Sequence, residues 1–295
     1  MSATRPGKAS LDFRREIAPV GAGSSSSGAA GAMKVAVNNI HAIGGVVIKE
    51  LCRRKDFYVL FVLTALITLI MGSVNFFNED KIVRYLKEIC LFLIWMSSLV
   101  IAITTTARQI PAEKENRTLF PLLAKPVTRN QLVLGKCLGC WLACGLTLLV
   151  FYTFFAVVSG AREHHWPILN YFQAGMMHWF TLAIVIAMAL IGSIVFAAPS
   201  SNSTITFVVV MGILLVGRHL DEVALQLTEP GQSVVYAVYF LIPHLEWSFD
   251  VRELIVHDRD LVSWAAWIGA CAYAVVYAAL LLTGACLLFR RKALN

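Results

Sequence analysis

Charged residues are scarce in this 295-residue chain. Asp, Glu, Lys and Arg make up 15% of it, whereas a soluble domain ordinarily carries about 25%. Apolar residues make up 58%. The few charges are also confined to certain stretches, so that long runs contain no Lys, Arg, Asp or Glu at all. This distribution excludes an ordinary soluble domain and indicates a protein that is embedded in a membrane.

Six uncharged runs are long enough, or nearly so, to cross a bilayer as helices. A hydrocarbon core about 30 Å thick requires about 20 apolar residues in a helix. The runs do not alternate between polar and apolar residues, which argues against the strands of a membrane barrel. We therefore predict an all-α membrane protein with six transmembrane helices. The expected spans are Phe57–Phe77, Ile89–Ala107, Cys137–Ser159, Met176–Ala198, Ser203–Gly217 and Leu261–Phe289.

The basic residues predict the orientation of these spans. If the N-terminus is cytoplasmic, the cytoplasmic side carries twice as many Lys and Arg residues near the spans as the outer side does. Basic residues favour the cytoplasmic side, so both termini are expected there, in a multi-pass protein of the plasma (inner) membrane. The net charge of +7 then reflects topology, and we expect no nucleic-acid partner.

Three segments outside the spans have a distinct character. Residues 1–32 are rich in Ser, Gly and Ala and are expected to be disordered; we interpret Met33 as an alternative start, so that 33–295 form the membrane domain. Residues 34–55 are amphipathic, which favours a helix lying in the inner-leaflet interface over an ordinary lead-in to the first span. In the outer loop, 218–260, the run Val234–Ile242 is closed by Pro243. It is too short to cross the membrane and is expected to form a re-entrant or interfacial helix.

The chain lacks the groups that would let it drive transport alone. His178 is the only ionisable side chain in the expected spans, and ion-coupled carriers usually need such groups at membrane depth. A phosphate-binding loop is also missing, because Gly135-Lys136 is followed by Cys137 and residue 130 is Asn. An intramembrane enzyme would need clustered His, Asp or Glu, which the spans lack. We expect neither catalysis nor a cofactor on this chain.

The seven cysteines offer no metal or disulfide framework. None of them lies in an expected outer loop. Cys137, Cys140 and Cys144 share one side of a helix, but a structural zinc site requires a fourth ligand, and none is near in the sequence. We interpret these cysteines as small apolar residues of a span, and no bound metal is expected.

The largest cytoplasmic loop, 108–136, has a sequence that favours a defined shape. Pro111 suits the first turn of a helix, and Glu113 follows where negative charge is favourable. Pro121 and Pro126 prevent a long helix. Thr128 and Gln131 then have capping-box spacing, Thr-x-x-Gln. The sequence therefore predicts a short helix, a break, and a new helix that enters the membrane.

This loop resembles the cytoplasmic-loop signature of type 2 ABC transporter permeases. The resemblance rests on Glu-Lys-Glu-Asn-Arg-Thr-Leu at 113–119, on Leu-Leu-Ala-Lys-Pro-Val-Thr-Arg at 122–129, and on the Gly-Lys pair at 135–136. The outer run Leu-Ile-Pro-His-Leu-Glu at 241–246 is also similar to an element of that family between spans five and six. One departure is Asn116-Arg117-Thr118, since Gly often precedes the Thr in the family.

The resemblance implies both partners and a mechanism. Such permeases work as homodimers or heterodimers with two cytoplasmic ABC ATPases, which bind ATP and Mg, and a coupling helix in the first cytoplasmic loop contacts the ATPase. By position, Thr128 and Lys136 would set the loop's exit. The candidate ATPase-coupling residues are Glu113, Glu115, Arg117, Thr118 and Arg129.

Two functions remain open at this point. The first is the permease subunit of an ATP-driven exporter. The alternative is a non-transporting membrane anchor or scaffold that recruits an ATPase, or an outer complex through 218–260.

Overall fold

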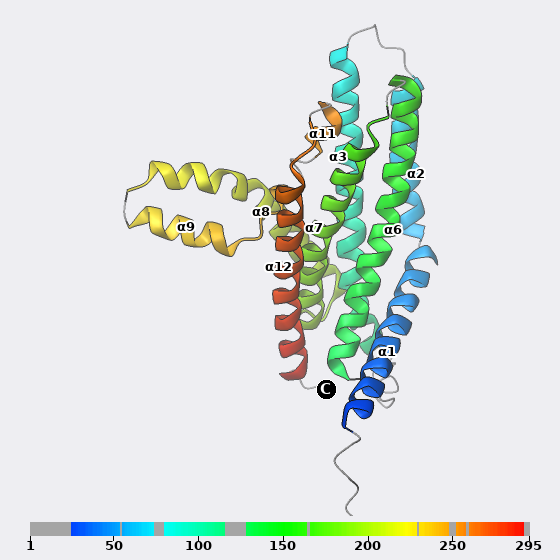
Figure 1. Cartoon of the computed structure of the whole chain (residues 1–295), viewed down its shortest axis with the longest axis vertical. Helices are drawn as coiled ribbons and strands as arrows, with labels where there is room; N and C mark the ends of the chain where they lie inside the picture. The colour runs from blue at the N-terminus through cyan, green and yellow to red at the C-terminus, as the bar shows by residue number, and fades with distance from the viewer. Residues whose placement is uncertain are drawn as a thin grey trace, which may run out of the picture. The chain divides into compact units, whose positions relative to one another are not determined.

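The computed structural model describes residues 25–53, 55–73, 80–115, 128–163, 166–228, 230–247, 252–257 and 260–291. All regular secondary structure within these ranges is helical, which confirms the all-α prediction. The helices are α1 Ser25–Arg53, α2 Lys55–Ser73, α3 Asp80–Ala107, α4 Gln109–Glu115, α6 Arg129–Glu163, α7 Ile168–Val195, α8 Pro199–Gln226, α9 Gly231–Leu241, α11 Glu253–Val256 and α12 Trp264–Arg291 (Figure 1).

Within the described part of the chain, five helical stretches are long and apolar enough to cross a membrane. They are Lys87–Glu113, Arg129–Ala161, Ile168–Val195, Pro199–Gly217 and Trp264–Arg291. The chain is therefore a multi-pass membrane protein. The remaining expected span, Phe57–Phe77, coincides with α2 as far as Ser73 but is not among the five, and residues 74–77 lie outside the described part of the chain.

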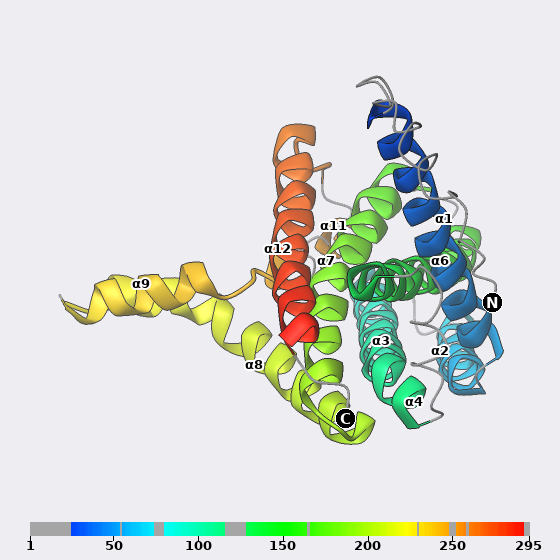
Figure 2. The ribbon, with the colours of Figure 1, turned by 90° about the horizontal axis from the view of Figure 1, so that it is seen from below.

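Two helices extend beyond the expected spans. Helix α6 begins at Arg129, where the capping box predicted a helix start, before the expected span at Cys137, and α8 continues to Gln226 beyond the expected end at Gly217. The predictions followed uncharged runs, whereas helical hydrogen bonding continues through polar residues that need not lie in hydrocarbon. Helix α8 then turns back into α9, which packs against it as a hairpin and extends away from the other helices (Figure 2). Thus part of the expected outer loop is helix.

The chain divides into two units, residues 1–38 and 39–295. In the first unit, residues 25–38 are helical, so the expected disordered tail, 1–32, is corrected at its end: α1 begins at Ser25. Ala29, Ala30 and Ala32 account for this difference, because Ala is the strongest helix former. Residues 1–24 lie outside the described ranges.

In the second unit, α3, α6 and α7 form the centre of the bundle. Helix α7 packs against α3, α6, α8 and α12, and more than half of its residues are buried (Figure 2). The buried surface is made of apolar side chains from all of these helices. Some polar groups within the spans are satisfied locally: the Thr147 and Thr181 hydroxyls each donate to the carbonyl four residues earlier. The buried Thr106 hydroxyl has no hydrogen-bond partner among the described residues. This arrangement fixes α7 as the helix on which the others are assembled.

Two tryptophans join α6 to α7 at membrane depth. The indole Nε1 of Trp141 donates to the carbonyl of Trp179 at 3.0 Å, and the Nε1 of Trp179 donates to the carbonyl of Trp141 at 2.9 Å. The two rings stack with centroids 4.3 Å apart. Gly145 leaves room for this stack, because a Cβ there would lie 2.5 Å from Trp179 Nε1. The register of α6 against α7 is therefore fixed by two hydrogen bonds at once.

Residues 39–53 of α1 pack against α6 through glycine. A Cβ on Gly139 would lie 2.8 Å from the Cα of Gly44 and 2.9 Å from the Cβ of Val47, so the two backbones are in close contact. Gly135 lies one helical turn away and is just as close to Ile43. Small residues spaced by four allow such approach between membrane helices. Whether α1 lies in the membrane interface stays a prediction.

We predict that Gly139→Leu will separate α1 from α6. Backbone atoms cannot yield to the new side chain, so the expected loss is about 1–3 kcal/mol of stability, measured as a lower unfolding temperature in detergent. Gly284→Leu is the matched control, since nothing lies within 4 Å of a Cβ at that position. Equal unfolding temperatures for the two variants would contradict the close α1–α6 contact.

Candidate functional site

The short helix α4 is held to the bundle by an ion pair. Lys136, on α6, places its Nζ 2.8 Å from Glu113 Oε1 and donates to Gln109 Oε1 at 3.0 Å. The Lys136 side chain is 5% exposed and that of Glu113 is 20% exposed. Gln109 in turn donates to the Thr105 carbonyl on α3. A charged pair this shielded from water is costly to break, so α4 has a fixed position against α3, α6 and α7.

The apolar side of α4 is buried as well. Ile110 is 6% exposed, Pro111 is also buried, and α4 packs against α3 and α7. Pro111 lies in the first turn, as the sequence predicted, where its missing N–H leaves no hydrogen bond unmade.

The predicted coupling residues take different places around α4. Glu113 turns toward Lys136 and so positions α4, whereas Glu115 is exposed at the end of the helix. Arg117 and Thr118 lie outside the described residues. The ion pair of Glu113 with Lys136 was not foreseen, because the two are 23 positions apart in the sequence. A helical spacing rule relates only residues three or four apart.

The loop's exit is built as the capping-box spacing predicted. The backbone N–H of Thr128 donates to Gln131 Oε1 at 3.1 Å, and the backbone N–H of Gln131 donates to Thr128 Oγ1 at 3.3 Å. These two bonds satisfy N–H groups that have no partner within a helix. The prediction that a helix starts here is confirmed, and this helix is long and apolar enough to cross a membrane.

Arg129 connects this exit to the end of α12. Its Nη1 donates to the carbonyls of Phe289 and Arg290, at 3.3 and 3.4 Å, and its guanidinium lies 5.9 Å from the centre of the Phe289 ring. Carbonyls in the last turn of a helix have no helical partner and attract a cation. Arg129 therefore ties the loop to the last span. No signal in the sequence pointed to this contact.

His178 lies on α7 and is 2% exposed. Its Nε2 is 2.9 Å from Ser98 Oγ on α3, and its Nδ1 is 3.3 Å from the Tyr152 hydroxyl on α6. A neutral imidazole donates with one nitrogen and accepts with the other, and a hydroxyl can match either role. His178 thus joins three helices through a satisfied polar contact.

A second polar cluster lies where α9 returns to the bundle. Glu246 is 9% exposed, and its Oε1 is 2.9 Å from His244 Nδ1. Its Oε2 is buried with no hydrogen-bond partner among the described residues, and it lies against Gly217 of α8. The His244 ring packs against aromatic neighbours on three sides. These are Tyr239, Trp247 and Tyr273, with centroids 4.5, 5.3 and 5.7 Å away.

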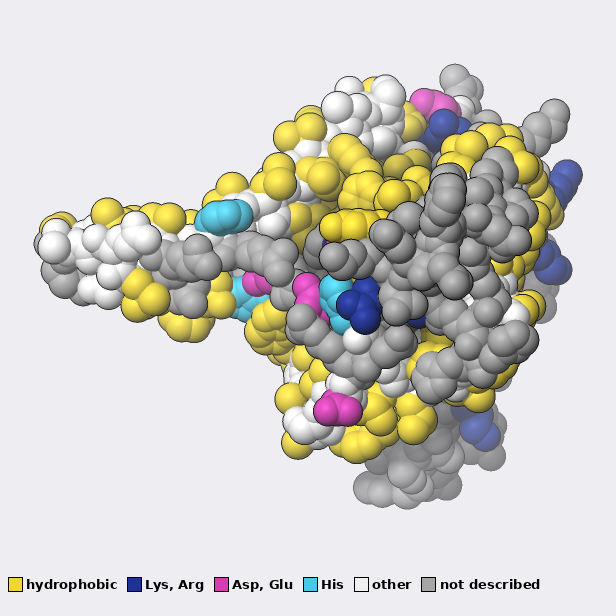
Figure 3. Space-filling view, turned by 90° about the horizontal axis from the view of Figure 1, so that it is seen from above, with side chains coloured by type: hydrophobic (Ala, Val, Ile, Leu, Met, Phe, Trp, Pro, Cys, Tyr) yellow, Lys and Arg dark blue, Asp and Glu magenta, His cyan; other side chains and the backbone are white. Residues whose placement is uncertain are grey.

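Two tyrosines of α12 fix the end of the hairpin. Tyr273 accepts a hydrogen bond from the His244 backbone N–H at 3.3 Å, and Tyr277 donates to the Leu241 carbonyl at 2.7 Å. The run 241–246 that resembled a family element is therefore the joint between the α8–α9 hairpin and α12. Viewed from the end that holds α11, hydrophobic side chains cover much of the described surface, including parts of the projecting α8–α9 hairpin (Figure 3).

Comparison with known proteins decides the family. Residues 61–294 match the profile of the family described as ABC-2 family transporter protein. The chain belongs to the ABC-2 transporter family. Its membership makes it a membrane permease subunit of an ABC transporter and implies an ABC ATPase as partner. A search of the curated proteins found no match.

The cysteines of the ABC-2 permease are packed as apolar residues. Cys137, Cys140 and Cys144 belong to the buried core, and these three, Cys90, Cys271 and Cys286 are free thiols. Within the described ranges, no group of three or more His, Cys, Asp or Glu is placed to hold a metal ion.

We predict that Lys136→Met will release α4 of the permease. The Glu113 carboxylate would lose its cation while still partly buried, at a cost of about 1–3 kcal/mol. Hydrogen exchange of the amides in 109–115 is the direct measurement and should become faster. The double variant Glu113→Gln/Lys136→Met should recover part of the protection, and the exposed Lys49→Met serves as control. Unchanged exchange in Lys136→Met would mean that packing alone holds α4.

We also predict that His244→Phe will destabilise the joint at α12. Phe retains the aromatic packing but removes the only hydrogen-bond partner found for the buried Glu246 carboxylate among the described residues. The expected loss is about 1–3 kcal/mol, read as a lower unfolding temperature. In His244→Phe/Glu246→Leu no carboxylate is stranded, so most of the loss should be recovered. If the single and double variants unfold at the same temperature, the contact between His244 and Glu246 does not hold the joint.

Proposed function

We propose that this chain is the six-span permease of an ATP-driven exporter in the inner membrane, with both termini in the cytoplasm. Its ATP and Mg are bound by a separate ATPase, and a second permease subunit, identical or different, completes the transporter. The observation that carries this proposal is α4: a short helix, fixed by a buried cation and ending in the exposed Glu115. A docking element for an ATPase needs both a firm base and an exposed face.

The contacts of this region support a route for mechanical coupling. A displacement of α4 acts on α6 through Lys136, and a displacement of the loop's exit acts on α12 through Arg129. Both helices are among those long enough to span the membrane. Closure of two ATPases against the loop would therefore move two spans, α6 through Lys136 and α12 through Arg129.

The test is recovery of the ATPase with tagged permease variants. Glu115→Lys reverses an exposed charge on α4. It should reduce co-purified ATPase several-fold, because like charges that face each other across an interface weaken binding. Glu50→Lys is the matched control, an exposed glutamate of α1. Undiminished recovery when 109–127 is replaced by a Gly-Ser linker would sink the proposal that this loop docks the ATPase.

A second measurement separates a transporter from an anchor. The complex reconstituted in vesicles should hydrolyse ATP at a rate that responds to candidate substrates, whereas a scaffold leaves the ATPase at its basal rate.

A further inference from the structure

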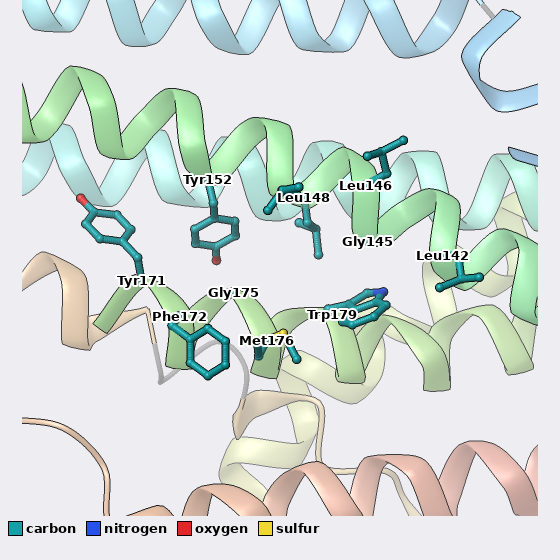
Figure 4. A pocket seen from close by; sticks show the side chains of 11 residues that line it. Leu142, Gly145, Leu146, Leu148, Tyr152, Tyr171, Phe172, Gly175, Met176 and Trp179 are labelled. Carbon is teal, nitrogen blue, oxygen red and sulfur yellow. The ribbon is translucent and has the colours of Figure 1, made fainter. Parts of the chain in front are cut away.

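A groove runs between α6 and α7 on the side that faces away from the bundle centre. Its volume is about 430 Å³, within the range of small-molecule sites. Figure 4 shows Tyr152 and Leu148 of α6 and Met176 and Trp179 of α7 around it. The side chains at its edges are about half exposed or more: Leu146 is 48% exposed, Leu149 is 64% exposed and Phe172 is 48% exposed. Because both helices are long and apolar enough to span a membrane, the groove opens toward the bilayer.

The groove has space at Gly175. Gly175 faces the Tyr152 ring, and the nearest atom to a Cβ there would be 3.8 Å away, so the backbone at Gly175 has space in front of it. The second glycine of the lining, Gly145, is covered by the Trp179 indole. At one end the groove is closed by the stacked Trp141–Trp179 pair, and at the other by Tyr171 packed on Phe155. It is thus a bounded hollow rather than a continuous furrow between helices.

Two polar atoms of the lining are already bonded within the protein. The Tyr152 hydroxyl is bonded to His178, and the Trp179 Nε1 donates to the Trp141 carbonyl. Apart from the Tyr171 hydroxyl, the other lining side chains are aliphatic, aromatic or thioether. A ligand here therefore gains mainly apolar contacts, and a polar or charged ligand would lose most of its hydration without compensation.

The dimensions of the groove select the kind of apolar ligand. From Tyr171 to Trp179 it follows α7 for about 12 Å, and from Leu142 to Tyr152 it follows α6 for about 15 Å, at 1.5 Å per residue. That length is roughly half of a hydrocarbon core about 30 Å thick. Its volume over that length corresponds to a width of about 6 Å, too narrow for a helix, which with side chains is about 10–12 Å across. A helix of a second copy could therefore cover the open side of this groove but would not fit inside it.

We propose that this groove binds one acyl chain of a membrane lipid. The chain lies along α6 and α7, packs on Met176 and Phe172, and ends against the Trp141–Trp179 pair. The ligand class is thus an amphiphile with a linear aliphatic tail, held at the tail.

The experiment uses the full chain in nanodiscs, without ATPase, so its result is independent of the proposed function. The probe is a phosphatidylcholine with a photoactivatable diazirine in one acyl chain, present in trace amount. After illumination, labelled peptides are identified by mass spectrometry. We expect labelling of 142–152 and 171–179 to exceed, several-fold, that of the exposed α8 surface around Val208 and Val209.

Substitution of the glycines distinguishes a site from general lipid contact. Gly175→Leu fills the groove and should reduce its labelling to the level of α8, whereas Gly284→Leu on α12, where a Cβ meets open space, should leave it unchanged. Gly175→Ala, which adds a methyl at ordinary contact distance, should retain the fold and most of the labelling. Equal labelling of the groove and α8 in the unsubstituted protein would overturn the proposal. So would groove labelling that persists in Gly175→Leu, or photolinks between two copies of the chain at these residues.

Discussion

Hydrocarbon offers no hydrogen-bond partner, so the polar side chains of this permease's spans must find partners within the protein. Hydroxyls of Thr147 and Thr181 bond back to their own helices. An imidazole and an ammonium bridge between helices instead: His178 joins α7 to α3 and α6, and Lys136 joins α6 to α4. The need to satisfy polar groups thus also decides which helices are connected. The same need leaves the groove walls apolar.

The sequence predicted the elements whose causes are local. Uncharged runs located the five stretches that are long and apolar enough to cross a membrane, Thr128 and Gln131 located the start of α6, and Pro111 located α4. The contacts between elements could not be predicted in the same way. Arg129 binds backbone carbonyls of α12. Because every residue has a backbone carbonyl, the sequence does not show which ones a distant side chain will contact. The glycines of α6 allow close contact with α1, yet in the sequence a glycine also reads as a weakness of a helix.

The candidate site shows the same division. The loop pattern identified the region and the family, and that resemblance is confirmed. It did not separate residues by role: Glu113 faces inward to Lys136, and Glu115 faces outward. A glutamate in an internal ion pair and an exposed glutamate cannot be told apart by residue type in a sequence. The two glutamates are told apart by Lys136, a buried residue in the first part of α6, because Glu113 pairs with it.

The tryptophan pair has a consequence for how the permease changes shape. Each indole donates to the backbone of the other, so a slide of α6 along α7 by a single residue, about 1.5 Å, breaks both bonds and the ring stack together. No intermediate keeps one half of the contact at full strength. The two bonds are therefore expected to form or break together, so that α6 and α7 move as one rigid body. Movement during a transport cycle is then expected at the contacts of this pair with α2, α8 and α12.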